Sequence, residues 1–139
     1  MISPLIERLL RQHGYPLLDA ENYQQFVYAQ DYAVLFFPND PVQFPESNDV
    51  AVVLPELLKA LQQPLQAAVV GKSIERELQR QFRFNRWPAL VFLKHGDYLG
   101  AITGIRDWQD FLTEGANILN SPATEPPPFD FDTICTGGH

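Results

Sequence analysis

The sequence predicts one α/β domain in which helices flank a central mixed sheet. Three short apolar runs, 32–37, 65–70 and 89–93, are each bounded by turn-forming residues and indicate buried strands. The segments between them carry apolar residues at three- and four-residue spacing, which is typical of amphipathic helices. A tight turn at 95–97 joins the last run to a strand at 98–102, so we expect these two strands to form an antiparallel hairpin.

A helix is expected at the start of the chain, over residues 4–13. Ser3 is a good N-cap, Pro4 suits the first helical position, and Gly14 stands where a helix commonly ends. One apolar stripe along this segment would face the rest of the domain. It consists of Leu5, Ile6, Leu9 and Leu10.

An edge strand and a second helix are predicted before the first buried strand. Residues 15–18 suit an edge, because Pro16 cannot donate a hydrogen bond to a neighbouring strand. Asp19 is expected to cap the second helix, on which Tyr23 and Phe26 share an apolar face. The strand at 32–37 then follows.

A loop rich in proline and turn-forming residues, 38–49, leads from this strand into the next helix. Asp49 is expected to cap that helix, and Pro55 inside it should produce a kink. The strand at 65–70 comes next. It is followed by a helix that Ser73 is expected to cap.

The last helix, over 107–119, is expected to bury Trp108 among its apolar residues. From Ser121 onward the sequence contains prolines and acids, no Lys or Arg, and no helical period, which predicts a mobile or extended tail. The expected division is therefore a domain over 1–120 and a proline-rich acidic tail over 121–139.

Length and charge limit the classes of function. At 139 residues, with 45% of them hydrophobic, the chain can close one ordinary core. The net charge of -7 is segregated, because residues 12–58 contain acids but no Lys or Arg, the stretch 59–106 is basic, and the residues after 106 are acidic or neutral. An acidic surface repels nucleic acid and anionic membranes and attracts basic partners, but it also simply keeps a protein soluble.

Location and metal chemistry follow from what the sequence lacks. No apolar run approaches the roughly 20 residues that cross a bilayer, and the first residues lack the features of a secretory signal. We therefore expect a cytoplasmic protein without stable membrane insertion. The three histidines are far apart and Cys135 is the single cysteine, so we expect neither a metal site nor another cofactor.

The predicted order of elements resembles the thioredoxin fold, preceded by one extra helix. In that fold a buried strand leads into a redox motif and a proline-kinked helix, and a cis-proline precedes a hairpin. The strand end VLFF, the helix containing Pro55 and the segment FRFNRWPALVF resemble these three parts. Pro88 is the expected cis-proline, because an X-Pro bond becomes cis at a cost of only about 1 kcal/mol.

The cysteine pair of thioredoxins is missing. It should fall between Phe37 and Asp49, where the sequence has no cysteine. Disulfide exchange needs a thiolate nucleophile and a second thiol that resolves the mixed disulfide, and Cys135 lies far away in the tail. The sequence therefore predicts a binding protein rather than an enzyme, with a residual thiol-redox role for Cys135 as the alternative.

A more specific resemblance is to the hydrogenase expression/formation accessory proteins, which serve membrane-bound nickel-iron uptake hydrogenases. The motifs that carry it are Pro45-Glu46 with Asp49, the Glu56-Leu57-Leu58 run, FRFNRWPALVF, and Gly104-Ile105. The resemblance implies a chaperone that binds the hydrogenase small-subunit precursor and its twin-arginine signal peptide before export, together with contacts to other maturation proteins. A scaffold within the maturation complex is the alternative.

What remains of a thioredoxin site without its thiols is a surface that docks extended peptides. The peptide group at Trp87, before the expected cis-proline, would pair with a peptide strand as in sheet-edge addition. Phe44, Pro38 and Pro41 in the loop opposite would supply the other apolar wall. Plain packing of Trp87 in the core is the alternative.

A peptide with two arginines calls for carboxylates, because arginine pairs with them in a bidentate geometry. The acidic block next to the cis-proline segment would supply them. The candidate peptide-binding residues are therefore Trp87, Pro88, Asp40, Phe44, Glu46, Asp49 and Glu56. Asp49 also fits a helix cap, and Glu46 and Glu56 also fit a solvated surface.

A basic cluster occupies the segment between the second and third buried strands. Its members are Lys72, Arg76, Arg80, Arg83 and Arg86. Glu75 and Glu77 interrupt it and no aromatic stacking platform accompanies it, which argues against nucleic-acid binding. A solvated helix face and a second contact with a protein partner are the two interpretations that remain.

Overall fold

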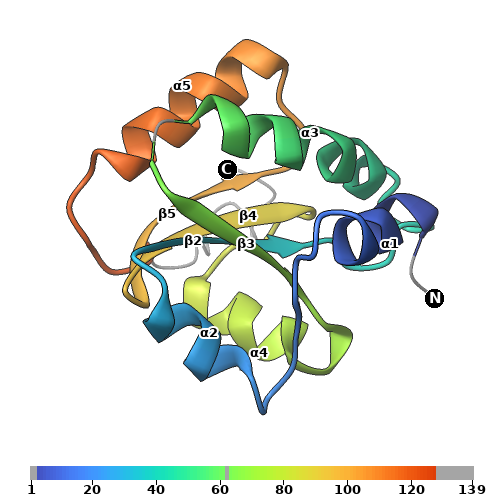
Figure 1. Ribbon diagram of the computed structural model, residues 1–139, viewed down its shortest axis with the longest axis horizontal. Helices are drawn as coiled ribbons and strands as arrows, with labels where there is room; N and C mark the ends of the chain where they lie inside the picture. The colour runs from blue at the N-terminus through green and yellow to red at the C-terminus, as the bar shows by residue number, and fades with distance from the viewer. Residues whose placement is uncertain (1–2, 62, 128–139) are drawn as a thin grey trace, which may run out of the picture.

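The computed structural model describes residues 3–61 and 63–127, and it has a five-stranded sheet with helices on both faces (Figure 1). The helices are α1 (Pro4–Arg11), α2 (Tyr23–Ala29), α3 (Glu46–Ala60), α4 (Lys72–Phe82) and α5 (Trp108–Leu119). The strands are β1 (Leu17–Leu18), β2 (Tyr32–Phe37), β3 (Leu65–Val70), β4 (Ala89–Lys94) and β5 (Asp97–Thr103). The predicted α/β class and the order of its elements are confirmed.

The sheet is mixed, with the strand order β1-β3-β2-β4-β5. β1, β3 and β2 are parallel, whereas β4 runs antiparallel to both β2 and β5. The predicted hairpin and edge strand are therefore confirmed. Phe37 at the end of β2 pairs with Ala89 at the start of β4, so the loop after β2 lies beside the residues that precede β4.

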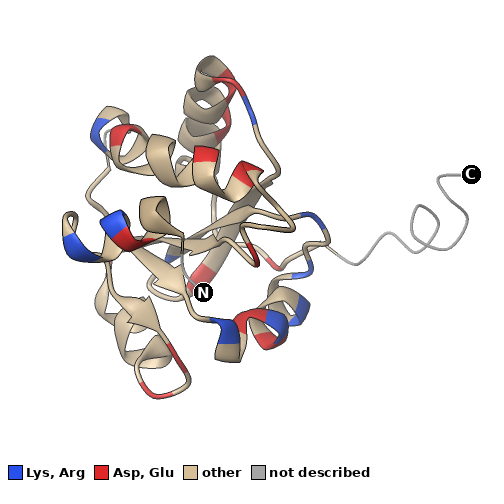
Figure 2. Cartoon of the chain, turned by 90° about the vertical axis from the view of Figure 1, so that its right-hand side faces the viewer, with Lys and Arg blue, Asp and Glu red and all other residues tan. Residues whose placement is uncertain are grey.

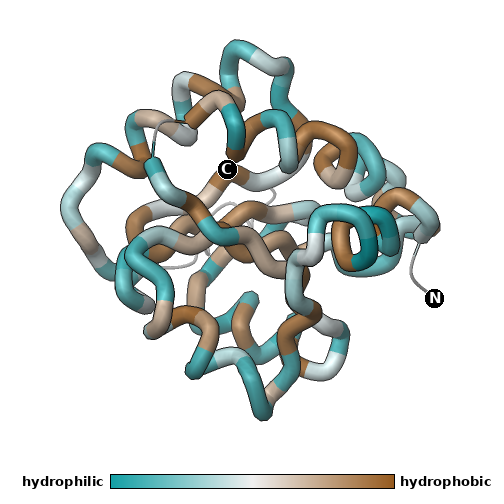
Figure 3. Tube along the Cα trace, viewed as in Figure 1, coloured by the Kyte–Doolittle hydropathy of each residue, from teal (hydrophilic) through white to brown (hydrophobic). Residues whose placement is uncertain are grey.

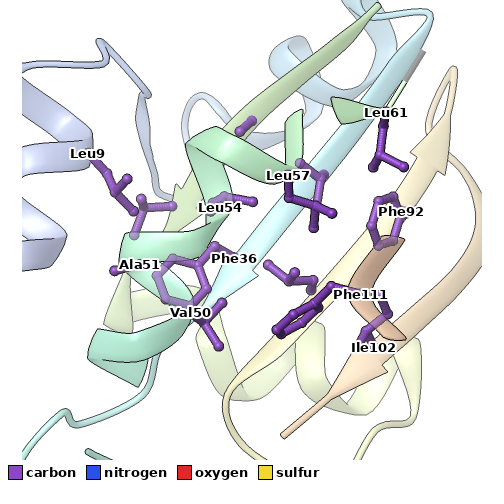
Figure 4. Close-up of a cluster of buried hydrophobic side chains, with 14 of the residues drawn as sticks. Leu9, Phe36, Val50, Ala51, Leu54, Leu57, Leu61, Phe92, Ile102 and Phe111 are labelled. Carbon is purple, nitrogen blue, oxygen red and sulfur yellow. The ribbon is translucent and has the colours of Figure 1, made fainter. Parts of the chain in front are cut away.

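The strands are apolar throughout because both faces of the sheet are covered. Side chains alternate along β2, so Phe36 lies in the core under α1, α3 and α5, and Phe37 lies in the core under α2 and α4. In the first core Leu54 and Leu57 of α3 belong to one cluster with Phe36, Phe92 and Phe111 (Figure 4). Figure 3 shows the hydrophobic residues along the strands and on the inner sides of the helices.

Three predicted helix caps are wrong. α2 begins at Tyr23, after Asn22, and Asp19 lies in the turn before it, where its carboxylate accepts the N–H of Glu21 at 2.9 Å. α3 and α4 each begin before the expected cap, so Asp49 and Ser73 lie inside the first turns and neither caps a helix. Tertiary contacts set both starts. The Ser47 hydroxyl ties the first turn of α3 to the preceding loop, and the N–H of Gly71 before α4 donates to the Leu18 carbonyl at 2.9 Å.

The remaining helix ends follow the sequence more closely. Ser3 caps α1 by accepting the N–H of Ile6 at 3.2 Å, and Asp107 caps α5 by accepting an N–H of the first turn at 3.0 Å. Trp108 was expected to be buried but is 43% exposed. It occupies the first position of α5, and Phe111, 1% exposed and one turn later, fills the core instead.

The kink expected at Pro55 stays a prediction, since α3 runs through this residue as one helix. Residues 121–127 form neither helix nor strand, whereas 128–139, which include Cys135, lie outside the described residues. Within the described ranges, no helix is both long enough and apolar enough to cross a membrane.

Candidate peptide-binding site

The β2–α3 loop, residues 38–45, stands where a redox motif was expected, and hydrogen bonds hold its shape. The buried hydroxyl of Ser47 donates to the carbonyl of Pro38 at the other end of the loop. The Phe44 N–H donates to the carbonyl of Asp40 at 2.7 Å, and the Asp40 carboxylate accepts a further loop N–H at 3.0 Å. The loop is therefore ordered without a disulfide.

Glu75 of α4 supports this loop from the protein interior. The residue is 5% exposed, and its carboxylate accepts the N–H of Asn39 at 2.7 Å. Asn39 itself has a left-handed φ of 56°. Burial raises the pKa of Glu75, and the hydrogen bond from Asn39 opposes that rise.

The role of Glu75 was not predicted, because in the sequence this residue interrupts a basic cluster that fits a solvated helix face. A signal was present. Glu75 lies three residues before Leu78 and seven before Phe82, which are both buried, so the three residues share one helix face.

The Trp87–Pro88 peptide bond is cis, as the sequence predicted. Pro88 is buried, and its carbonyl accepts the N–H of Gly104 at 2.7 Å, which ties the segment to the end of β5. Among the described residues, no backbone hydrogen bond involves the N–H or C=O of Trp87. This peptide group is therefore available to an extended peptide.

Trp87 belongs to an aromatic cluster that joins the cis-proline segment to the β2–α3 loop. Its ring centroid lies 5.1 Å from that of Phe84, 6.4 Å from Phe37 and 6.5 Å from Phe44. Trp87 and Phe44 are each half-buried. The ring of Trp87 therefore packs on the core and also lies at the surface beside Phe44, and its binding of a peptide stays a prediction.

Two of the candidate carboxylates stand beside this surface. Glu46 and Asp49 are exposed in the first turn of α3, directly after the β2–α3 loop. Negative side chains are favourable at a helix N-terminus, so the fold tolerates both without a partner. Asp40 is half-buried and its carboxylate holds the loop turn, which leaves it less available to a ligand.

The structure separates Glu56 from the other candidates. It lies on α3 ten residues after Glu46, which is about 15 Å along the helix axis. Glu56 lines a hollow of about 260 Å³ with Arg8 and His13, and its carboxylate is 3.8 Å from the Lys59 ammonium. Sequence proximity to the acidic block did not reveal this separation, because it depends on where α1 packs.

The basic cluster lies on and after α4, with all five side chains exposed. In Figure 2 this helix appears at the lower right, with basic and acidic residues mixed along it. No three metal-ligating side chains come together within the residues that the structure describes.

Comparisons of sequence place this chain in a family. The family model described as hydrogenase-1 expression protein HyaE matches residues 5–111. The hydrogenase expression/formation protein HoxO of Azotobacter vinelandii is 48% identical over 119 residues, which cover 86% of this chain and 80% of the relative. The protein HupG of Rhodobacter capsulatus is 40% identical over 117 residues, covering 84% and 85% of the two chains.

Solved structures agree with this relationship. The crystal structure of a putative hydrogenase expression/formation protein hupG from Rhodopseudomonas palustris is 37% identical, with a TM-score of 0.53, and covers 75% of this chain and 94% of that one. Desulfothioredoxin from Desulfovibrio vulgaris, at 20% identity and a TM-score of 0.60, covers 74% and 96% and shows that the fold is thioredoxin-like. The chain belongs to the HyaE family of hydrogenase expression proteins.

Proposed function

We propose that this protein is a non-catalytic assembly chaperone in hydrogenase formation, and that it binds the small-subunit precursor through its twin-arginine signal peptide. It acts in the cytoplasm, before export, and contacts other maturation proteins. The proposed binding surface consists of Trp87, Pro88, Phe44, Asp40, Glu46 and Asp49. Glu56 is left out because it faces α1.

The observation that carries this proposal is the unpaired peptide group of Trp87 beside an aromatic wall. An extended peptide that pairs with this N–H and C=O would gain backbone hydrogen bonds without any requirement on its sequence. The rings of Trp87 and Phe44 would then bury apolar side chains of the peptide. Such a surface suits the apolar stretch of a signal peptide.

The carboxylates would allow the surface to distinguish arginine from lysine. Glu46 and Asp49 are exposed next to the aromatic wall, and neither forms an ion pair with a described residue. Arginine pairs with a carboxylate through two parallel hydrogen bonds, which lysine does not reproduce. Asp40 would contribute mainly through its negative charge.

A binding role rather than catalysis also agrees with the β2–α3 loop. This loop has no cysteine, and its place is held by the Ser47 and Glu75 hydrogen bonds. Thiol exchange requires a thiolate at an accessible, electropositive position. A Cys135-dependent mixed disulfide with the precursor, lost in Cys135→Ser, would instead support the thiol-redox alternative.

The proposal is tested by titrating the precursor's signal peptide against the full chain by calorimetry. We expect the double variant Glu46→Gln, Asp49→Asn to bind about tenfold more weakly, which corresponds to about 1.4 kcal/mol. Glu56→Gln is the control, since it removes one charge from the same helix outside the proposed surface. Equal affinity for all three proteins would reject the carboxylate site.

A second arm changes the peptide. Replacement of its two arginines by lysines should weaken binding to the parent chain and have a smaller effect on the double variant. Capture of other maturation proteins without any dependence on the signal peptide would favour the scaffold alternative.

A further inference from the structure

The described part of the tail follows a defined path away from α5. The N–H of Thr124 donates to the carbonyl of Tyr98 on β5 at 2.8 Å, so the tail runs along the edge of the sheet. Two residues later, the Arg83 guanidinium donates to the carbonyl of Pro126 at 3.0 Å. The tail therefore passes from α5, on one face of the sheet, to the end of α4, on the other face.

At that point the tail meets exposed arginines without acidic partners. We call Arg80, Arg83 and Arg86 the basic surface. None of the three has a carboxylate within salt-bridge distance among residues 3–61 and 63–127, whereas Arg106 pairs with Glu114 at 2.9 Å. The basic surface therefore carries positive charge that the described residues leave uncompensated.

The sequence that follows has the complementary charge. Residues 128–132 read Pro-Phe-Asp-Phe-Asp, so acids and aromatic residues alternate directly after the contact at Arg83. In an extended chain, alternate side chains point to one side and repeat at about 6.6 Å. Arg80 lies in the last turn of α4 and Arg83 is its C-cap, so the two residues are about 4.5 Å apart along the helix axis, and their long side chains can spread to carboxylates with the wider spacing.

The reach of the segment is sufficient. Asp130 lies four residues after Pro126, which allows at most about 14 Å of extended chain. Because the Pro126 carbonyl already contacts Arg83, the carboxylates start within this distance of the basic surface.

We propose that residues 128–132 dock on the basic surface, with the carboxylates of Asp130 and Asp132 pairing with its arginines. The tail is thus an intramolecular ligand, present at an effective concentration in the millimolar range. One consequence rests on the proposed function. The basic surface adjoins Trp87 and would repel an arginine-rich peptide, and the docked acids neutralise it.

Docking is tested without any peptide, through the single cysteine of the chain. A nitroxide attached to Cys135 of the full protein should broaden the amide signals of residues 80–87 at low salt. This broadening should weaken at high salt and in Asp130→Asn, Asp132→Asn. The control is Glu21→Gln, Glu125→Gln, which changes the net charge equally at two exposed residues. The proposal would be overturned if both double variants retained the broadening at residues 80–87. It would also be overturned if the nitroxide broadened these signals no more than those of other segments.

The consequence is tested by the affinity for the precursor's signal peptide. At low salt we expect Asp130→Asn, Asp132→Asn to bind it several-fold more weakly than the control double variant, with the difference disappearing at high salt. If Asp130→Asn, Asp132→Asn binds the peptide more tightly than the control, the tail competes for the site. If the two variants bind it equally at low salt, the tail has no electrostatic effect. Either result would overturn the neutralising role. If no protein binds the peptide, the proposed function fails while the nitroxide experiment still decides the docking.

Discussion

Ser47→Ala tests whether one buried hydrogen bond holds the β2–α3 loop in place. Ser47 is 0% exposed, and its hydroxyl donates to the buried carbonyl of Pro38, nine residues earlier in the chain. The alanine variant keeps the helical backbone of α3 and removes only the oxygen. The Pro38 carbonyl then loses this donor in a place that water does not reach freely.

The expected cost is that of leaving a buried acceptor unsatisfied, about 1–3 kcal/mol in the free energy of unfolding. The unfolding entropy of a domain this size is about 0.3 kcal/mol per kelvin, from about 2.1 cal/mol/K for each residue. The same loss therefore lowers the Tm by about 3–10 °C. In urea, with an m-value of about 1–3 kcal/mol/M, the midpoint should shift by about 1 M.

The assay is urea unfolding followed by circular dichroism, with Ser73→Ala as the matched control. Ser73 is also near the start of a helix, but it is exposed and caps nothing. The control therefore carries the same gain in helix propensity without the loss of the bond. If the two variants agree within about 0.5 kcal/mol, the hydroxyl does not anchor the loop and the reasoning is wrong.

Three further predictions concern stability. Burial raises the pKa of Glu75, so between the pKa values of the unfolded and folded states the folded protein binds one proton more on this carboxyl. The contribution of this proton to stability is therefore full below the unfolded pKa and is lost as the pH rises through the folded pKa. Glu75→Gln should flatten this dependence in urea melts at pH values above the usual pKa of a glutamate, and an unchanged slope there would exclude Glu75 as its source. Gly96→Ala should cost more than Gly14→Ala, because both have a positive φ but only the added methyl at Gly96 would lie 2.4 Å from the Tyr28 ring, and equal losses would show that the ring moves aside freely. Phe92→Ala should lower the unfolding free energy by about 3–5 kcal/mol, since this side chain is 0% exposed in the core under α3, and a loss below about 1 kcal/mol would contradict the packing described here.

Local patterns in the sequence were sufficient to predict most of the helices and strands. The apolar run 32–37 predicted a strand buried on both faces, and the alternation of Phe36 and Phe37 between two cores is the reason that it is apolar throughout. The cis bond at Pro88 and the Ser3 cap of α1 were predicted equally well. Each of these features depends on residues close together in the chain, so the sequence contains the whole signal.

The candidate site was predicted only in part. The approach of Phe44 to Trp87 followed from the order of the strands, because the loop after β2 lies beside the start of β4. The start of α3 before Asp49 did not follow from the sequence, because the hydrogen bond of Ser47 that fixes this start reaches back across the loop to Pro38. Glu56 was grouped with the other acids by proximity in sequence, although α1 packs on its side of the helix.

By itself, the sequence determined the order of elements, the burial of the central strands, the cis-proline and the absence of cysteine from the β2–α3 loop. Only the tertiary structure decided which charged residues share a surface. The contact of Asn39 with Glu75 spans 36 residues, and that of Arg83 with Pro126 spans 43. Such contacts depend on how helices and loops pack on the sheet, and hydrophobic periodicity encodes which face of an element is buried but not what that face will touch.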